Sequence, residues 1–203
     1  ALRHMTRHLL ANAAGLFSVN RFYNDLKSRG LRISKDSLHA YLGHLEDTFL
    51  VCGVWLVTES DRQRMSNPRK IYPVDPGLIP IFDRSGRIQP SKALETAVCV
   101  ELLRYGVEIG YVRTRAGFEV DFLARWPGGD LELIQVCAEV TSTATLEREI
   151  RALEAAAEEH RGASLSLVTL VPESIRKAPA QIQIHDACLW LLRSVGHAQT
   201  TPG

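Results

Sequence analysis

The chain has 203 residues, of which 45% are hydrophobic and 23% charged, a globular composition that excludes a disordered chain. The net charge is only +1, but residues 1–90 hold 13 Lys and Arg against 8 Asp and Glu, whereas residues 91–203 hold 11 against 15. This contrast and the turn-rich stretch Asp83–Lys92 predict two domains, at residues 1–88 and 89–203.

The sequence also predicts a cytoplasmic protein without a membrane segment. The longest apolar stretch, Phe49–Val57, is far shorter than the roughly 20 residues that a membrane-spanning helix needs. The first residues are basic and amphipathic, with no small-residue cleavage site. The four cysteines lie far apart, which indicates reduced thiols. Since Ala1 already lies in a helical pattern, we expect the chain to be part of a longer protein.

The first half of the chain shows three helical patterns and then two strands. Apolar residues recur at helical spacing from Leu2 until about Gly15. A second helix is expected from a cap at Asn20, and a third over Ser34–Thr48 with Ser34 as its cap. The strands are expected over residues 49–60 and 69–75, joined by a polar, turn-rich segment. This order is that of a winged helix-turn-helix, in which the third helix reads DNA.

Basic side chains gather at the tip of the expected hairpin, and one lies on the third helix. Contacts between these side chains and phosphates would give a salt-sensitive affinity that does not depend on sequence. The alternatives are a solvated loop, or a winged helix used for packing inside a larger protein. The residues predicted to contact nucleic acid are Lys35, Arg62, Arg64, Arg69 and Lys70.

The second half alternates helices and strands. The long helix between its last two strands is the connection that a parallel pair requires, so we expect a mixed central sheet. A helix, three strands, a helix and a strand form the core of the PD-(D/E)XK nucleases. The expected fold class is therefore α/β, with an all-α-plus-hairpin N-terminal part. The predicted elements are helix 94–105, strands 108–114, 117–125 and 131–139, helix 146–160 capped by Thr145, strand 164–171 and helix 187–195.

Polar residues of this half fall where a nuclease of that fold carries its site. Glu119 and Asp121 are two apart in a strand and share a face; Gln135 and Cys137 do so in the next strand. Glu95 lies on the preceding helix. A working site uses acids at these places to hold Mg²⁺, and a lysine two residues after the second acid to orient water. An amide replaces that acid here and a thiol replaces the lysine, so we predict a degenerate site in which Asp121 is the residue suited to Mg²⁺.

Several segments together resemble the C-terminal region of AAA-like ATPases of bacteria and archaea. They are YLGHLEDTFLV, KIYPVDPGL, LETAVCVELLRYG, GFEVDFL, and LELIQVC followed by TLEREIRAL, and they cover roughly residues 15–172. In that group a nucleotide-binding domain precedes a winged helix and a PD-(D/E)XK-like domain of unknown function, and many members have IEVK in place of IQVC. The resemblance implies an N-terminal ATPase domain as a partner. ATP would bind there, because this chain has no GxxxxGK[ST] loop.

Functions of different classes stay open at this point. The first is a non-catalytic module, without a cofactor of its own, that binds DNA or a partner protein and is coupled to the ATPase. The second is an active Mg²⁺-dependent DNA endonuclease, in which Glu119 or Glu139 replaces the missing acid. A transcription regulator that uses the winged helix alone is the third. Alternatively, Glu119 and Asp121 only face solvent at a sheet edge or bond to Arg113 and Arg115 on the neighbouring strand. The thiol of Cys137 favours the first function, and homo-oligomerisation stays open.

Overall fold

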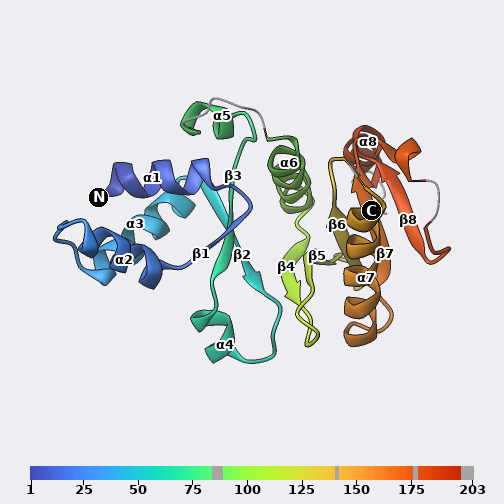
Figure 1. Ribbon diagram of the computed structural model, residues 1–203, viewed down its shortest axis with the longest axis horizontal. Helices are drawn as coiled ribbons and strands as arrows, with labels where there is room; N and C mark the ends of the chain where they lie inside the picture. Colours follow the sequence, from blue (N-terminus) through green and yellow to red (C-terminus); the bar gives the residue numbers. More distant parts are fainter. Residues whose placement is uncertain (84–88, 140–141, 176–177, 198–203) are drawn as a thin grey trace, which may run out of the picture. The chain divides into compact units, whose positions relative to one another are not determined.

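The structure is a computed structural model that describes residues 1–83, 89–139, 142–175 and 178–197 (Figure 1). The chain forms two compact units, Ala1–Thr96 and Ala97–Gly203. The division falls inside helix α6 (Pro90–Arg104), whose first residues, as far as Thr96, belong to the N-terminal unit. The domain boundary predicted from the sequence lies earlier, after residue 88. Within the predicted boundary Asp83–Lys92, residues 84–88 lie outside the described residues.

The N-terminal unit consists of helices and a small antiparallel sheet in the order β1-β3-β2. Gly15 of β1 stands opposite Ile71 of β3, and Val51 of β2 stands opposite Pro73. The three helices and the hairpin were expected, whereas β1 and the short helices α4 and α5 were not. The elements before α6 are α1 (Leu2–Ala11), β1 (Gly15–Phe17), α2 (Val19–Ser28), α3 (Lys35–Asp47), β2 (Val51–Leu56), α4 (Asp61–Ser66), β3 (Arg69–Pro73) and α5 (Leu78–Phe82).

Serine side chains begin three of these helices by accepting a backbone N–H three residues later. Ser34 Oγ lies 3.0 Å from the amide nitrogen of Ser37, which confirms the predicted cap of α3. The predicted cap of α2 at Asn20 is wrong, because Ser18 performs this role two residues earlier. Ser60 begins α4 in the segment expected to be only a turn.

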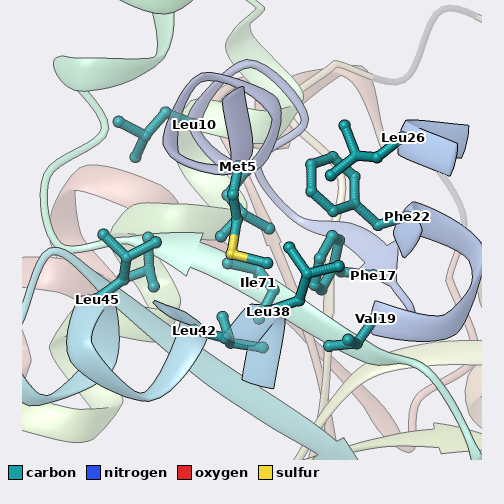
Figure 2. Close-up of a cluster of buried hydrophobic side chains, with 12 residues drawn as sticks. Met5, Leu10, Phe17, Val19, Phe22, Leu26, Leu38, Leu42, Leu45 and Ile71 are labelled. Atoms are coloured by element: carbon teal, nitrogen blue, oxygen red, sulfur yellow. The ribbon is translucent and has the colours of Figure 1, made fainter. Parts of the chain in front are cut away.

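One apolar cluster holds the N-terminal unit together. Figure 2 shows side chains from α1, α2 and α3 pointing toward Ile71 of β3. Met5, Leu26, Leu38 and Leu42 have no exposed surface, so a smaller side chain at any of these positions would leave a cavity. The buried members are Met5, Leu9, Leu10, Phe17, Val19, Phe22, Leu26, Leu38, Leu42, Leu45, Val51 and Ile71.

The C-terminal unit contains a mixed sheet, as predicted. Strands β4, β5 and β6 are antiparallel neighbours, and β6, β7 and β8 follow in parallel. Strand β8 was not predicted. After α6 the elements are β4 (Glu108–Arg113), β5 (Glu119–Arg125), β6 (Leu131–Val136), α7 (Thr143–Glu159), β7 (Ser164–Thr169), the 3-10 turn η1 (Pro172–Ser174), β8 (Ile182–Asp186) and α8 (Ala187–His197).

Helix α7 packs on strands β5 and β6 and determines which side chains are enclosed on that face of the sheet (Figure 1). Its cap is Ser142, which accepts from the amide of Thr145 at 3.2 Å, so the predicted cap at Thr145 is wrong by three residues. Leu123 stands opposite Leu133, and Leu133 opposite Leu165. Because side chains alternate along a strand, Asp121 and Gln135 share this face.

Both units thus combine helices with a sheet, and the α/β class is confirmed. Among the residues described, no helix has the length and apolar character that crossing a membrane requires.

Candidate functional site

The strand residues Asp121 and Gln135 meet beneath helix α7 and bond to each other's backbone. The backbone N–H of Asp121 donates to Gln135 Oε1 at 3.3 Å. A carboxylate oxygen of Asp121, Oδ2, accepts from the backbone N–H of Val136 at 3.0 Å. Both side chains belong to residues that are only 7% exposed. These bonds join the neighbouring strands β5 and β6, so the two polar side chains are part of the sheet's packing.

Helix α7 adds a carboxylate that the sequence interpretation missed. Gln135 Nε2 donates to Glu149 Oε2 at 2.8 Å, and Glu149 is itself 7% exposed. Its other oxygen accepts two bonds from the guanidinium of Arg148, whose side chain is 66% exposed. The amide of Gln135 therefore uses both its oxygen and its nitrogen inside the protein. A buried polar group without partners costs about 1–3 kcal/mol, and these bonds remove that cost.

Cys137 closes the same cluster, which we call the Gln135 cluster: Asp121, Gln135, Cys137, Arg148 and Glu149. The thiol donates to the backbone oxygen of Glu139 at 3.3 Å, and Cys137 is 9% exposed. Burial raises the pKa of the Cys137 thiol, and the negative charge of Glu149 raises it further. The thiol is therefore protonated at neutral pH and carries no charge, so it cannot perform the electrostatic role of a lysine.

Glu119 and Glu139 lie in different surroundings from the buried cluster members. Glu119 begins β5, is partly exposed, and stands opposite Arg113 in the antiparallel pair. Glu139 follows the end of β6 and is exposed. The second carboxylate that the structure places inside the cluster is that of Glu149, and both Glu119 and Glu139 lie outside it.

Glu95 bonds within the N-terminal unit. Its Oε1 accepts from Lys70 Nζ at 3.1 Å and from the hydroxyl of Tyr72 at 2.7 Å. The side chain of Lys70 is 4% exposed and that of Glu95 is 14% exposed. This corrects the prediction that Lys70 is an exposed cation at the hairpin tip: a lysine this deeply buried in β3 serves as the partner of a carboxylate.

The Gln135 cluster does not fit Mg²⁺ as it is arranged. Magnesium binds through oxygen ligands in near-octahedral geometry and attracts carboxylates that are open to it. Here Asp121 Oδ2, Gln135 Oε1 and both oxygens of Glu149 already accept hydrogen bonds from the protein. Among the described residues, no group of three or more His, Cys, Asp or Glu side chains is arranged to hold a metal ion. A cation would have to share these oxygens with the internal bonds that they accept.

The basic hairpin has two kinds of arginine. Arg62 and Arg64 lie on α4 and are exposed, and the guanidinium of Arg64 lies 5.8 Å from the ring centre of Trp55. Arg69, by contrast, is only 16% exposed and pairs with Glu46 at 2.9 Å while stacking on Trp55 at 4.5 Å. Burial lowers the pKa of Arg69, and Glu46 opposes that change. Arg62 and Arg64 can therefore reach a ligand, whereas Arg69 supports the hairpin.

Lys35, the remaining predicted contact residue, begins α3 and is exposed, with its ammonium 5.4 Å from the ring centre of Tyr23. The charged side chains of the same helix are mixed: Asp36 and Asp47 are exposed, and Glu46 is committed to Arg69. Helix α3 thus has no basic face, and the exposed positive charge of the hairpin is on α4.

A signal for Glu149 was present in the sequence. Leu146, Glu149 and Leu153 follow each other at spacings of three and four along α7, and all three are buried. An acid in the apolar stripe of a helix indicates a buried polar partner, because charged residues are rarely fully buried alone.

Comparison of the chain with protein-family models, with curated proteins and with solved structures found no match.

Proposed function

We propose that this chain is a non-catalytic module that binds DNA or a partner protein, and that it works as the C-terminal region of an AAA-like ATPase. The observation that carries the proposal is the amide of Gln135, which bonds to the Asp121 backbone and to Glu149. A nuclease needs open carboxylates and a positive charge at this place. The Gln135 cluster instead has a neutral amide and a neutral thiol in bonds that hold β5, β6 and α7 together.

The proposal includes a winged helix for the N-terminal unit. Support comes from the order α1-β1-α2-α3-β2-β3 and from the antiparallel sheet β1-β3-β2, in which the short first strand pairs with the last. The exposed arginines Arg62 and Arg64 lie between β2 and β3, where the wing of such a domain would contact phosphates.

For the C-terminal unit the proposal is a PD-(D/E)XK-like domain with a degenerate site. Three antiparallel strands, a crossover helix and a parallel strand follow α6 in the expected order. Asp121, Gln135 and Cys137 lie together on the face beneath α7, as the resemblance implies for the former site.

A second candidate, an active Mg²⁺-dependent endonuclease, is favoured by one observation. Glu149 supplies a second carboxylate beside Gln135 in addition to Asp121. If the internal bonds opened, the carboxylates of Asp121 on β5 and Glu149 on α7 would both be available between the sheet and the helix. The position of the lysine would still hold the neutral thiol of Cys137, because Arg148, the cation of the cluster, is bound to Glu149. Loss of one preorganised charge-stabilising group typically costs about 10²–10³ in rate.

The experiment that separates the two candidates is a combined binding and cleavage assay. Plasmid and single-stranded DNA are incubated with the chain in Mg²⁺ and in Mn²⁺, beside an Asp121→Ala control. We expect a salt-sensitive shift of DNA at low salt, weakened by Arg62→Ala with Arg64→Ala, and no cleavage above the control. Cleavage that disappears with Asp121→Ala would establish the endonuclease and refute the proposal.

A further inference from the structure

A groove of about 930 Å³ lies beside α1 in the N-terminal unit. One side of α1 forms its wall, and residues at the end of α2, after α5 and at the start of α6 complete it. This groove contains neither the Gln135 cluster nor the basic hairpin. Helix α1 contributes Arg3, His4, Arg7 and His8 to this groove, and the fold brings Lys92 of α6 to the same place.

The charges of the groove are mostly positive. Two acids line it beside four cations: Asp25 is bonded to Arg29, with Oδ1 and the guanidinium 3.1 Å apart, and Asp83 accepts from the side-chain amide of Gln89 at 2.7 Å. In the part of the chain that the structure describes, Arg3, Arg7 and Lys92 have no ion-pair partner. These three cations therefore give the groove a positive field that an anionic ligand would neutralise.

Two imidazole rings lie beside the cations. His4 and His8 are one helical turn apart on α1, and their ring centres are 6.3 Å and 5.0 Å from that of Phe22. His8 also lies 5.8 Å from Phe17. Partial burial lowers the pKa of His8, so its ring is neutral at neutral pH although one side of it stays open. Both rings line the groove and rest on an apolar base.

We infer that this groove binds a single-stranded nucleic acid, with Arg3, Arg7 and Lys92 on its phosphates and His4 and His8 against its bases. The inference rests on the proposed nucleic-acid-binding function and assigns it a second surface and a substrate class. Arg3 and Arg7 are one turn of α1 apart, about 6 Å along the axis, an interval similar to that between successive phosphates of a strand. Proteins hold single strands by placing cations along the phosphate backbone and flat rings against the bases.

An acidic peptide would use only part of this arrangement. Its carboxylates would satisfy the three cations, but the rings of His4 and His8 would have no flat partner. A double helix would offer phosphates to the arginines while keeping its bases stacked inside. The combination of charges and rings therefore favours a strand with accessible bases.

The test measures fluorescence anisotropy of a labelled oligothymidine, of a duplex of equal length and of a poly-glutamate peptide over a salt series. The groove variant is Arg3→Glu with Arg7→Glu. The matched control is Arg115→Glu with Arg161→Glu, which changes the net charge equally at two exposed arginines of the other unit. We expect the groove variant to bind the oligothymidine at least about tenfold more weakly and to lose about 1.4 from the salt slope, because two phosphate contacts disappear. The control should stay within about twofold of the parent.

A second variant tests the rings. His4→Ala should weaken binding of the oligothymidine about fivefold without changing the salt slope, because it removes a stacking surface and no cation contact. Circular dichroism and thermal melting verify that each variant is folded. If charge reversal unfolds the chain, Arg3→Gln with Arg7→Gln provides the same comparison.

Several results would overturn the inference. They are equal losses in the groove variant and its control, unchanged binding in the groove variant, and tighter binding of the duplex or of the peptide than of the oligothymidine. Weaker binding only in the hairpin variant, Arg62→Glu with Arg64→Glu, would refute the groove and leave DNA binding in place. A parent chain that binds no nucleic acid at low salt would refute the groove and the DNA-binding function together.

Discussion

Gln135 Nε2 lies 2.8 Å from Glu149 Oε2, and this bond joins strand β6 to helix α7 through two side chains that are almost fully buried. The same amide accepts from the backbone of Asp121 on β5. One neutral side chain thus connects three elements of the C-terminal unit. The amide of Gln135 donates an N–H to Glu149. An ionised carboxylate at position 135 would have no proton to donate at neutral pH.

Removing this amide should destabilise the chain. Gln135→Ala removes the donor to a buried oxygen of Glu149 and the acceptor of the Asp121 N–H, so we expect a loss of about 2–3 kcal/mol in the free energy of unfolding. Gln183→Ala is the matched control, because Gln183 is exposed on β8, and it should cost under about 0.5 kcal/mol. Urea unfolding measures both. A double-mutant cycle with Glu149→Ala should give a coupling of about 1 kcal/mol or more, and purely additive effects would contradict the bond.

The cysteines should differ strongly in reactivity. Burial raises the pKa of Cys137, and the thiolate is the form that reacts. Cys188 is exposed. We expect iodoacetamide at neutral pH to label Cys188 rapidly and to label Cys137 only after unfolding. Mass spectrometry of peptides from a time course measures this, and fast labelling of Cys137 in the folded chain would disagree with the closed cluster.

Stability should decrease on mild acidification. Burial lowers the pKa of His8 below its ordinary 6.5, and it does the same for His160. The unfolded chain therefore takes up these protons first as pH falls, so the free energy of unfolding decreases from about pH 7.5 toward the folded pKa values. His8→Gln should reduce this slope and leave the part due to His160. Urea unfolding at a series of pH values measures this slope. The control is His39→Gln, at an exposed position of α3, which should leave the slope unchanged. An equal slope in His8→Gln and in the parent would contradict the assignment to His8.

Restoring the nuclease-type residues should create a dependence on magnesium. Gln135→Glu with Cys137→Lys places a second carboxylate against Glu149, so without metal we expect a lower melting temperature than that of the parent. Added Mg²⁺ should then raise the melting temperature of this variant, because a ligand that binds the folded state stabilises it. The parent and Gln183→Glu should not respond. An equal response in the parent would mean that its cluster already binds the ion.

Much of the fold could be predicted because its signals are local. The cap at Ser34, the alternation through Asp121 and Gln135, and the apolar stripe of α7 each depend on neighbours in the sequence. Strand β1 has three residues, and its pairing with β3 depends on chain more than fifty residues away, so no local pattern reveals it. Helix α4 was missed because its polar sequence resembles a turn and none of its residues is buried.

The candidate site was predicted in part for the same reason. Alternation along two strands brought Asp121, Gln135 and Cys137 to one place, but it could not show that Glu149 completes the cluster. Lys70 was misplaced because a lysine near a hairpin is ordinarily solvated. Its partner, Glu95, lies 25 residues further along the chain, so the pairing depends on tertiary packing.

The central claim, that the Gln135 cluster is closed, is tested most directly by paramagnetic NMR. The side-chain NH₂ signals of Gln135 are observed while Mn²⁺ is added, with the exposed amide of Gln183 as an internal reference. We predict that the Gln135 signals exchange slowly with solvent and stay as sharp as that reference. Selective broadening of Gln135 and of the Asp121 backbone signal at low Mn²⁺, absent in Asp121→Ala, would show an open cation site and contradict the account.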